Sequence, residues 1–338
     1  MNRRTRYFLE KVLTSPRHLL NTVLVMLSFK LRLTKVNGQP LVLDLEPSNT
    51  CNFHCPHCDV TYAAREKKAL SLTQYKVIMN SFPYALRVKL QGDGEPFTNK
   101  LLYQFIEDTC LRGAWCEVVT NGSILDRRKL RAIKRFKNFK LTVSFDAADK
   151  VTFEKIRPGS NFEKILENIG EITDGSAIDV AALMLLQEEN KDQMEGVIRL
   201  LAEKGVKSLG LQSLFFDFDK EREQSKIGGK WVKQDLTKNA HVSLKKYAKR
   251  YGVQLNISDK LYSREQICPW PWMGAFVDAS GNVVPCCRIG NADVCDMGNL
   301  SEKNFNEIWN SKAYKDFRLR HKINDLPEFC SGCYSDVP

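Results

Sequence analysis

Three cysteines near the start of the chain are spaced like the ligands of an iron–sulfur cluster. Cys51, Cys55 and Cys58 form a C-x3-C-x2-C run soon after the short apolar segment 41–45. Three thiolates on one short loop can bind three irons of a cubane [4Fe–4S] cluster, whereas complete protein ligation takes four cysteines. The remaining iron is then open to an outside molecule, which a reaction at the cluster requires and a purely structural cluster does not.

A zinc site is the alternative for the same loop. Zinc in structural sites takes four cysteine or histidine ligands. His54, His57 or a distant cysteine could complete such a set. The three cysteines by themselves leave both interpretations open.

A second group of cysteines lies near the other end of the chain. Cys268 and Cys286 form a C-x12-G-x4-C pattern, and Cys330 and Cys333 form a C-x2-C pair, for which a zinc ribbon is the alternative. The chain has eleven cysteines, and this grouping indicates metal or cluster sites rather than disulfides. Such thiols must stay reduced, which predicts a cytoplasmic protein.

The front motif resembles that of the radical S-adenosylmethionine (radical SAM) family. In that family the open iron binds the amino and carboxylate groups of S-adenosylmethionine (SAM), and the resemblance implies that Cys51, Cys55 and Cys58 are the cluster ligands. One departure is His57, which stands where the family usually has an aromatic residue, and a histidine could change hydrogen bonding at the cluster.

Further motifs extend this resemblance to the SAM-binding residues. Segment 92–96 (Gly-Asp-Gly-Glu-Pro) is similar to the family's Gly-Gly-Glu-Pro motif, with Asp93 as a departure. Ser144 and Asp146 occupy alternate strand positions and therefore share one face, and the guanidinium of Arg157 matches a carboxylate. The resemblance implies SAM contacts from Gly92, Gly94, Glu95, Pro96, Ser144, Asp146 and Arg157, with Gln187 and Asn190 near the adenine.

The tail resembles the auxiliary-cluster domains called SPASM or, in shortened form, twitch. Besides the cysteine spacing, Gly298-Asn-Leu and the segment 305–309 match a common stretch of these domains. The resemblance implies one auxiliary [4Fe–4S] cluster with four protein ligands, Cys268, Cys286, Cys330 and Cys333. Cys287 could replace Cys286, Cys295 is interpreted as a spare thiol, and Cys110 and Cys116 as packing residues.

Strand-like and helix-like runs alternate along the first two thirds of the chain. This alternation predicts parallel strands joined by right-handed crossovers. The predicted strands are 41–45, 86–91, 115–120, 140–145, 178–186 and 206–212, and the predicted helices are 71–82, 99–111, 126–136, 162–172 and 193–203. They indicate an α/β fold with a partial, TIM-like (β/α)6 barrel and a small C-terminal α+β iron–sulfur domain. In such barrels chemistry lies at the carboxyl ends of strands, where the Cys51–Cys58 loop falls.

The predicted domain organisation has four parts. A basic helical segment covers 1–40, the radical SAM core 41–216, a connector 217–262 that returns to helix at 236–250, and the auxiliary-cluster domain 263–338 with a hairpin turn at 278–282.

The charge distribution is uneven. The net charge is +11, and much of the excess lies in the first 40 residues, where eight basic residues face Glu10 alone: Arg3, Arg4, Arg6, Lys11, Arg17, Lys30, Arg32 and Lys35. The remainder is close to balanced, which does not favour nucleic acid as a partner. The apolar run 19–27 is too short to span a bilayer. A basic, apolar helix here could instead lie on an anionic membrane surface or pack against the barrel.

The resemblance implies an enzyme that cleaves SAM reductively to a 5′-deoxyadenosyl radical, which abstracts hydrogen from a substrate C–H bond. It also implies a low-potential electron donor of flavodoxin or ferredoxin type and oxidoreductase chemistry through the auxiliary cluster. We expect oxidation, epimerisation or dehydration of a small polyol, sugar or lipid-linked substrate. The alternatives are a peptide- or protein-modifying maturase, an RNA-modifying enzyme and a zinc protein without activity. No motif identifies a catalytic acid or base.

Overall fold

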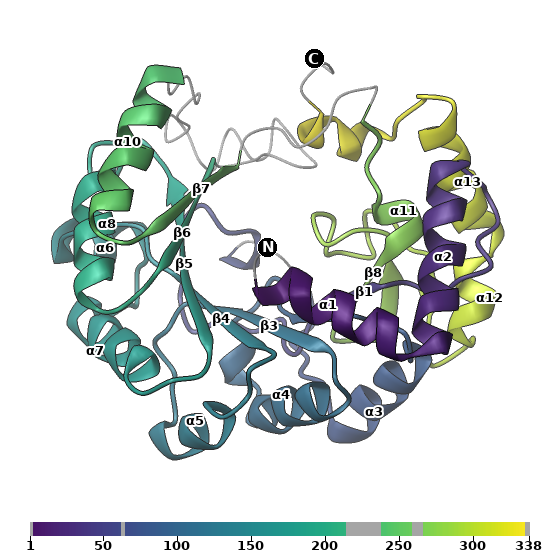
Figure 1. Cartoon of the computed structure of the whole chain (residues 1–338), viewed down its shortest axis with the longest axis horizontal. Coiled ribbons are helices and arrows are strands. Elements are labelled where there is room, and N and C mark those ends of the chain that lie inside the picture. The colour runs from purple at the N-terminus through teal and green to yellow at the C-terminus, as the bar shows by residue number, and fades with distance from the viewer. Residues whose placement is uncertain (1–2, 62–64, 214–237, 259–265, 335–338) are drawn as a thin grey trace. The chain divides into compact units, whose positions relative to one another are not determined.

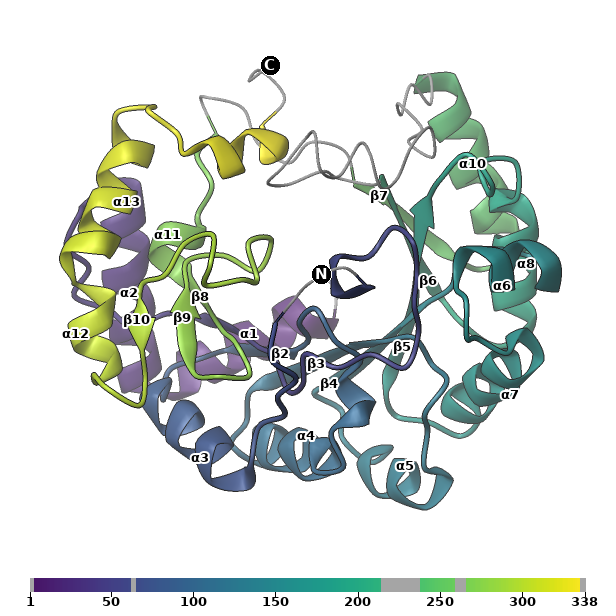
Figure 2. The same cartoon turned by 180° about the vertical axis from the view of Figure 1, so that it is seen from behind.

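The computed structural model describes residues 3–61, 65–213, 238–258 and 266–334. The chain forms two compact units, the first from residues 1–50, 65–117 and 260–338 and the second from residues 51–64 and 118–259. Figures 1 and 2 show the elements of both units from opposite sides.

The first unit is built around a mixed sheet. Strand β1 (Val42–Leu45) pairs in parallel with both β2 (Arg87–Leu90) and β8 (Gly274–Val277). Strand β8 then forms an antiparallel pair with β9 (Asn282–Val284), which pairs with the short β10 (Gly298–Asn299). The C-terminal segment therefore extends the sheet directly beside β1.

The first unit also contains seven of the helices that the structure describes. Ser71 and Gln74 form a reciprocal capping box at the start of α3, which fixes where that helix begins. The helices are α1 (Arg3–Thr14), α2 (Pro16–Lys30), α3 (Leu72–Ser81), α4 (Leu102–Leu111), α11 (Trp270–Met273), α12 (Phe305–Trp309) and α13 (Lys312–Lys322), with 3-10 turns η2 (Pro96–Thr98) and η3 (Glu328–Cys333). Among the helices that the structure describes, none combines the length and hydropathy needed to cross a bilayer.

The second unit is a parallel sheet with the strand order β4-β5-β6-β7. Its helices carry strong apolar faces, and α7 buries Phe162, Ile165 and Ile169. The strands are β4 (Phe139–Ser144), β5 (Asp179–Leu186), β6 (Ser208–Ser213) and β7 (Gln254–Ser258); the helices are α5 (Arg127–Ile133), α6 (Lys150–Ile156), α7 (Phe162–Thr173), α8 (Met194–Glu203) and α10 (Lys238–Arg250), with η1 at Asp59–Thr61. Strand β3 (Trp115–Thr120) contributes residues to both units.

The sequence predicts many of these elements, and several others were not expected. All six predicted strands and all five predicted helices are confirmed, as are the helix at 236–250 and the hairpin turn at 278–282. Strand β7 was not expected because it lies within the segment 217–262, interpreted as a connector, and β8 was not expected because it is four residues long and follows two Pro-Trp steps. Helix α6 was not expected either. The connector residues 217–225 and Gly228 lie outside the described part of the chain.

A buried arginine joins the N-terminal segment to the C-terminal helices. Arg318 on α13 is fully buried and donates hydrogen bonds to the carbonyl oxygens of Pro271 (2.8 Å), Thr34 (3.0 Å) and Trp309 (2.8 Å). Its guanidinium lies 4.2 Å from the Trp309 ring centroid, a favourable cation–π distance. Burial lowers the pKa of Arg318 to about 10, so it remains charged at neutral pH.

We expect Arg318→Met to lower the free energy of unfolding by roughly 2–4 kcal/mol, because three buried carbonyl groups would lose their donor. Denaturant titration followed by tryptophan fluorescence measures this change. Lys315→Met, an exposed position on the same helix, is the control and should shift the midpoint little. Equal effects of the two substitutions would contradict the role given to Arg318.

Candidate active site

The Cys51–Cys58 loop has a defined backbone conformation in the second unit. The Cys58 N–H donates to the Cys55 carbonyl oxygen (3.0 Å), and the Thr61 hydroxyl donates to the same oxygen (2.8 Å). The Phe53 N–H points at the Cys51 sulfur at 3.4 Å. The loop therefore closes into tight turns and supplies a backbone donor to a sulfur.

The electrostatic surroundings of this loop suit bound thiolates. Burial raises the pKa of the Cys55 thiol to about 11, and the nearby Arg157 opposes that rise. Arg157 is itself buried and also interacts electrostatically with Cys58. An iron–sulfur cluster brings negative charge to its cysteine sulfurs, so a buried guanidinium and N–H donors fit such a group. Among the described residues, no three His, Cys, Asp or Glu side chains are arranged to hold a single metal ion.

Asp146 and Arg157, both predicted to contact SAM, are paired with each other. Both the Nε and a terminal nitrogen of Arg157 lie 2.7 Å from one Asp146 oxygen, and the Leu185 N–H donates to the other oxygen at 2.8 Å. Asp146 is fully buried. Its direct contact with SAM stays a prediction; in this geometry its carboxylate orients Arg157 toward the cysteine loop. Ser144, at the end of β4, is half-buried.

Two polar side chains of the same unit, Asn121 and Gln187, contact residues of the loop. The Asn121 amide donates to Asn52 Oδ1 (2.9 Å) and approaches the Cys51 sulfur (4.0 Å). His57 Nδ1 lies 3.4 Å from the Gln187 amide nitrogen. Asn190, expected near the adenine, instead donates to two backbone oxygens and accepts from the Gln187 N–H, so its amide stabilises the turn after β5.

The loop 92–96 belongs to the first unit and requires its glycines. A Cβ atom on Gly92 would lie 2.3 Å from the Glu46 side chain, and one on Gly94 would lie 2.3 Å from the Ser48 carbonyl oxygen. The Glu95 N–H donates to the Thr50 carbonyl oxygen (2.9 Å), and the Glu95 carboxylate accepts a hydrogen bond from the Phe97 N–H (3.1 Å). Pro96, which lies between these two residues, is buried. These contacts hold the loop against the residues that immediately precede Cys51.

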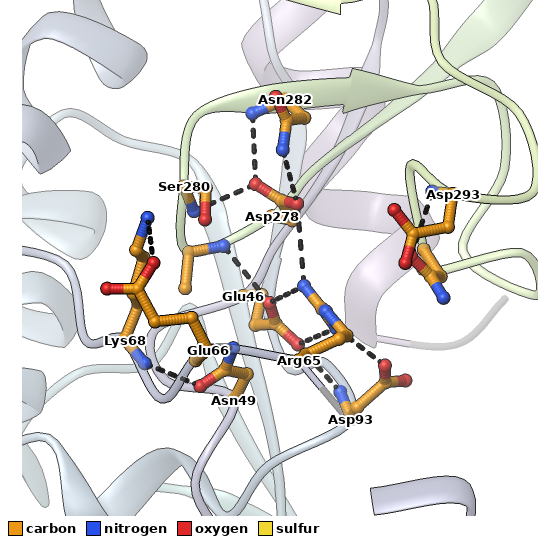
Figure 3. A network of polar contacts seen from close by, with 12 residues as sticks. Glu46, Asn49, Arg65, Glu66, Lys68, Asp93, Asp278, Ser280, Asn282 and Asp293 are labelled. Atoms are coloured by element: carbon orange, nitrogen blue, oxygen red, sulfur yellow. Dashed lines mark hydrogen bonds and ion pairs between the residues drawn. The ribbon is translucent and has the colours of Figure 1, made fainter. Parts of the chain in front are cut away.

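A network of charged residues centres on Arg65 in the first unit (Figure 3). Its guanidinium contacts Glu46 at 3.0 Å, Asp93 at 2.7 Å and Asp278 at 3.4 Å. Glu46 is fully buried and also accepts hydrogen bonds from the N–H groups of Asp93 and Ala279, both at 3.0 Å. The network ties the end of β1, the loop after β2 and the turn after β8 to one another.

The sequence gives only a partial signal for this network. Asp93 stands out as the departure from the family motif, and its carboxylate pairs with Arg65. Glu46 and Asp278 each follow directly after an apolar strand, a position at which buried polar residues often serve a site. Arg65 has no local signal, because its three partners lie far from it in the sequence.

The cysteines of the C-terminal segment are half-buried in the first unit. Burial raises the pKa of Cys330 well above its ordinary value, and the thiols of Cys268, Cys333 and Cys295 raise it further. The structure therefore brings Cys295, interpreted as a spare thiol, into the electrostatic environment of Cys330.

Polar groups contact three of the four predicted auxiliary ligands. The Arg288 N–H points at the Cys286 sulfur (3.3 Å), and such a donor fits a cluster-bound sulfur. His321 Nδ1 donates to the Phe317 carbonyl oxygen (2.9 Å), and its Nε2 lies 3.8 Å from the Cys330 sulfur, where it can accept from the thiol. The Cys268 N–H donates to the Tyr334 hydroxyl at 3.0 Å. A hydrogen bond with Cys286, together with burial, raises the pKa of Cys287.

Comparison with known families identifies the class of protein. Residues 45–201 match the model of the Radical SAM superfamily, and residues 268–334 match the SPASM iron–sulfur cluster-binding domain. The chain belongs to the radical SAM superfamily and carries a C-terminal SPASM domain. Its cofactors are SAM, the [4Fe–4S] cluster that binds it, and an auxiliary iron–sulfur cluster.

Several characterised proteins are similar to most of the chain. The tungsten-containing aldehyde ferredoxin oxidoreductase cofactor-modifying protein of Pyrococcus furiosus is 24% identical over 321 residues, which cover 86% of each chain. The PqqA peptide cyclase of Gluconobacter oxydans is 20% identical, covering 87% of this chain and 82% of the relative. The AdoMet-dependent heme synthase of Methanosarcina barkeri is 22% identical, and the match covers 88% of this chain and 92% of that relative.

Solved structures confirm the fold class. Streptococcus suis SuiB bound to precursor peptide SuiA superposes with a TM-score of 0.71 at 16% identity, covering 89% of this chain and 71% of SuiB. The anSMEcpe structure with bound AdoMet superposes with a TM-score of 0.66 at 16% identity, covering 88% of this chain and 92% of anSMEcpe. With the parallel strand pairs, this likeness confirms a partial TIM-like barrel with a C-terminal iron–sulfur domain.

We expect Arg65→Ala to weaken SAM binding about tenfold, equivalent to roughly 1.4 kcal/mol, because Glu46 would lose its cation and release the loop that contains Asp93. Equilibrium dialysis of the anaerobically reconstituted protein measures this affinity. Arg65→Lys should retain this affinity only in part, because the lysine ammonium keeps the positive charge but cannot contact several carboxylates at once as the planar guanidinium does. Lys68→Ala, which removes the exposed Lys68–Glu66 pair from the same loop, is the control and should leave SAM binding unchanged.

Gly94→Ala should also reduce SAM affinity by about tenfold, because the new Cβ would displace the backbone at 48–50 and with it the loop 92–96. The same dialysis assay tests this expectation. Gly170→Ala, inside α7, is the matched control. A Cβ atom on Gly170 would have a methylene of Lys204 at 3.8 Å as its nearest neighbour, which is an ordinary contact distance. Unaltered SAM binding by Gly94→Ala would show that this loop does not serve the site.

Proposed function

We propose that the chain is a radical SAM enzyme that modifies a peptide or protein, with Cys51, Cys55 and Cys58 as the ligands of the SAM-binding cluster. The observation that carries this proposal is the cysteine loop itself, with backbone donors and the buried Arg157 directed at its sulfurs inside the matched domain. When bound, the cluster supplies the electron that cleaves SAM to methionine and a 5′-deoxyadenosyl radical, which removes hydrogen from the substrate.

The remaining site residues bind and orient in this proposal. Asp146 holds Arg157, whose positive charge offsets the charge of the thiolates. Segment 92–96, held by Glu46 and Arg65, binds the amino group of SAM, and Ser144 contributes a hydroxyl at the carboxyl end of β4. Gln187 orients His57 beside the cysteine loop.

A peptide substrate has more support than the polyol, sugar or lipid-linked substrate expected from the sequence. The PqqA peptide cyclase is named for its action on a peptide, and the similar SuiB structure contains a precursor peptide. A further anSMEcpe structure also contains a peptide, with a TM-score of 0.63.

The auxiliary cluster completes the proposed reaction. We assign Cys268, Cys286, Cys330 and Cys333 as its ligands and give it the electron released when a substrate radical is oxidised. A flavodoxin or ferredoxin would reduce the cluster at Cys51–Cys58. This assignment predicts different phenotypes for the two cysteine groups.

Alanine at Cys51, Cys55 or Cys58 should lower 5′-deoxyadenosine formation by at least about 100-fold, because a missing thiolate leaves the SAM-binding cluster incomplete. The assay is anaerobic reconstitution, reduction in the presence of SAM, and chromatography of the nucleoside. Cys110→Ala, at a buried helical position, is the control and should retain activity. Purified protein that holds zinc but neither iron nor sulfide would overturn the proposal.

Alanine at Cys330 and Cys333 should leave SAM cleavage measurable while removing about four of the irons bound per chain, as expected for loss of one cubane cluster. Iron and sulfide analysis gives the count. A double variant that keeps all its iron would contradict the assignment of these two ligands.

The substrate class can be tested by following hydrogen transfer. Incubation with a perdeuterated peptide digest should place deuterium in 5′-deoxyadenosine, detected by mass spectrometry, whereas a perdeuterated mixture of sugars and polyols should not. The reverse result would favour the small-molecule reading and reject the peptide class.

A further inference from the structure

Helix α2 leaves most of its large apolar side chains exposed and buries two polar side chains against the protein. Its exposed large apolar side chains are Leu19, Leu20, Val23, Met26 and Leu27, which lie within one face at helical spacing. The buried residues on the opposite face are Asn21, Val25 and Ser28. This pattern is the inverse of that of an ordinary surface helix.

Specific contacts fix this orientation. The Asn21 amide donates to the Gln39 carbonyl oxygen (3.0 Å) and accepts from the Gln39 N–H (2.8 Å). The Ser28 hydroxyl donates to the Leu24 carbonyl oxygen (2.7 Å), and Val25 is completely buried beside Leu41 and Leu86. Because the polar groups of the inner face are satisfied, rotating α2 to bury its leucines would cost these bonds.

Further exposed leucines flank α2 in the sequence. Leu13 at the end of α1 is 71% exposed, and Leu31, just after α2, is 62% exposed. Leu9 and Leu33 are exposed as well. An exposed apolar surface of this extent indicates an interaction surface rather than scattered single residues.

Positive charge accompanies this surface. In the first 40 residues eight basic side chains face one acidic residue, Glu10, which pairs with Arg6. Arg17, Lys30 and Lys35 are exposed at or near the two ends of α2. Basic residues next to an apolar helical face match a bilayer that carries negative headgroups, since such surfaces attract both features at once.

A polar hollow lies beside the same helix. It measures about 460 Å³, and Arg17 and Leu20 form part of its lining together with Tyr84 and Asn306. The Gln39 side-chain oxygen, which also belongs to this lining, has no hydrogen-bond partner among the described residues. Polar groups directly adjacent to an apolar face suit the boundary between lipid tails and headgroups.

We infer that helix α2, with the end of α1, lies in the interface of an anionic phospholipid bilayer and holds the enzyme at a membrane surface. Charge complementarity favours this occupant over a second copy of the chain, because two such basic surfaces would repel each other. The inference does not depend on the class of substrate.

Vesicle sedimentation of the full, anaerobically reconstituted chain tests the inference. The protein should bind vesicles of phosphatidylcholine and phosphatidylglycerol at least about tenfold more tightly than phosphatidylcholine alone, and high salt should weaken the binding. The double variant Leu20→Asp/Met26→Asp should lose at least about tenfold of this binding. Its SAM cleavage in solution should match that of the unmodified chain.

Matched controls separate the surface from general effects. Leu111→Asp/Val151→Asp replaces two residues that are 69% and 79% exposed on other helices and should bind vesicles normally. Arg17→Glu/Lys30→Glu should abolish the preference for anionic lipid, whereas Lys76→Glu/Lys245→Glu, also at exposed positions, should keep it.

Two results would overturn the inference. One is vesicle binding by the unmodified chain that is absent or that Leu20→Asp/Met26→Asp leaves intact. The other is a stable dimer in light scattering that this variant dissociates, since the apolar face would then be an interface between copies. Neither result would affect the SAM-cleavage test, so failure of the membrane inference and failure of the proposed function remain distinguishable.

Discussion

The proposed chemistry depends on a positive charge that lies beside the thiols of the Cys51–Cys58 loop. Burial raises the pKa of Cys55 and so disfavours the thiolate that a cluster needs. Arg157 opposes this effect from a buried position, and Asp146, itself held by the Leu185 N–H, fixes the direction of its guanidinium. A charge placed in this way is effective because little solvent screens it. The residues at the ends of β4 and β5 thereby set the electrostatics of the cysteine loop.

The first unit uses the same principle with the signs reversed. There the buried group is the carboxylate of Glu46, and its stabilising charge is Arg65. Two backbone N–H groups complete the hydrogen bonding of Glu46 and fix the loop after β2 and the turn after β8 to the end of β1. Asp93, which looked like a departure from a family motif, supplies an additional partner for Arg65. A substitution of Asp278 in the C-terminal segment would therefore alter the contacts of Arg65, and through Arg65 those of the loop proposed to bind SAM.

The N-terminal segment is an integral part of the first unit rather than an appendage. Indole N–H groups of Trp272 and Trp309 donate to the carbonyl oxygens of Leu33 and Gly38, and Arg318 donates to Thr34. These bonds anchor the residues that follow α2, while Asn21 fixes the rotation of the helix itself. The outward position of the leucines on α2 is therefore a consequence of tertiary hydrogen bonding, and it produces the exposed apolar face that we infer to contact lipid.

The sequence alone determined the class of chemistry and most of the elements. Cysteine spacing, a turn motif and the alternation of strand and helix are local features, and they predicted the cluster motifs, the (β/α) repeat and the segment 92–96. Tertiary structure alone decided the pairing of Asp146 with Arg157, the position of Arg65 among three carboxylates, the placement of β8 beside β1 and the outward face of α2. The physical reason is that burial and charge pairing depend on residues distant in the chain, which no local pattern encodes.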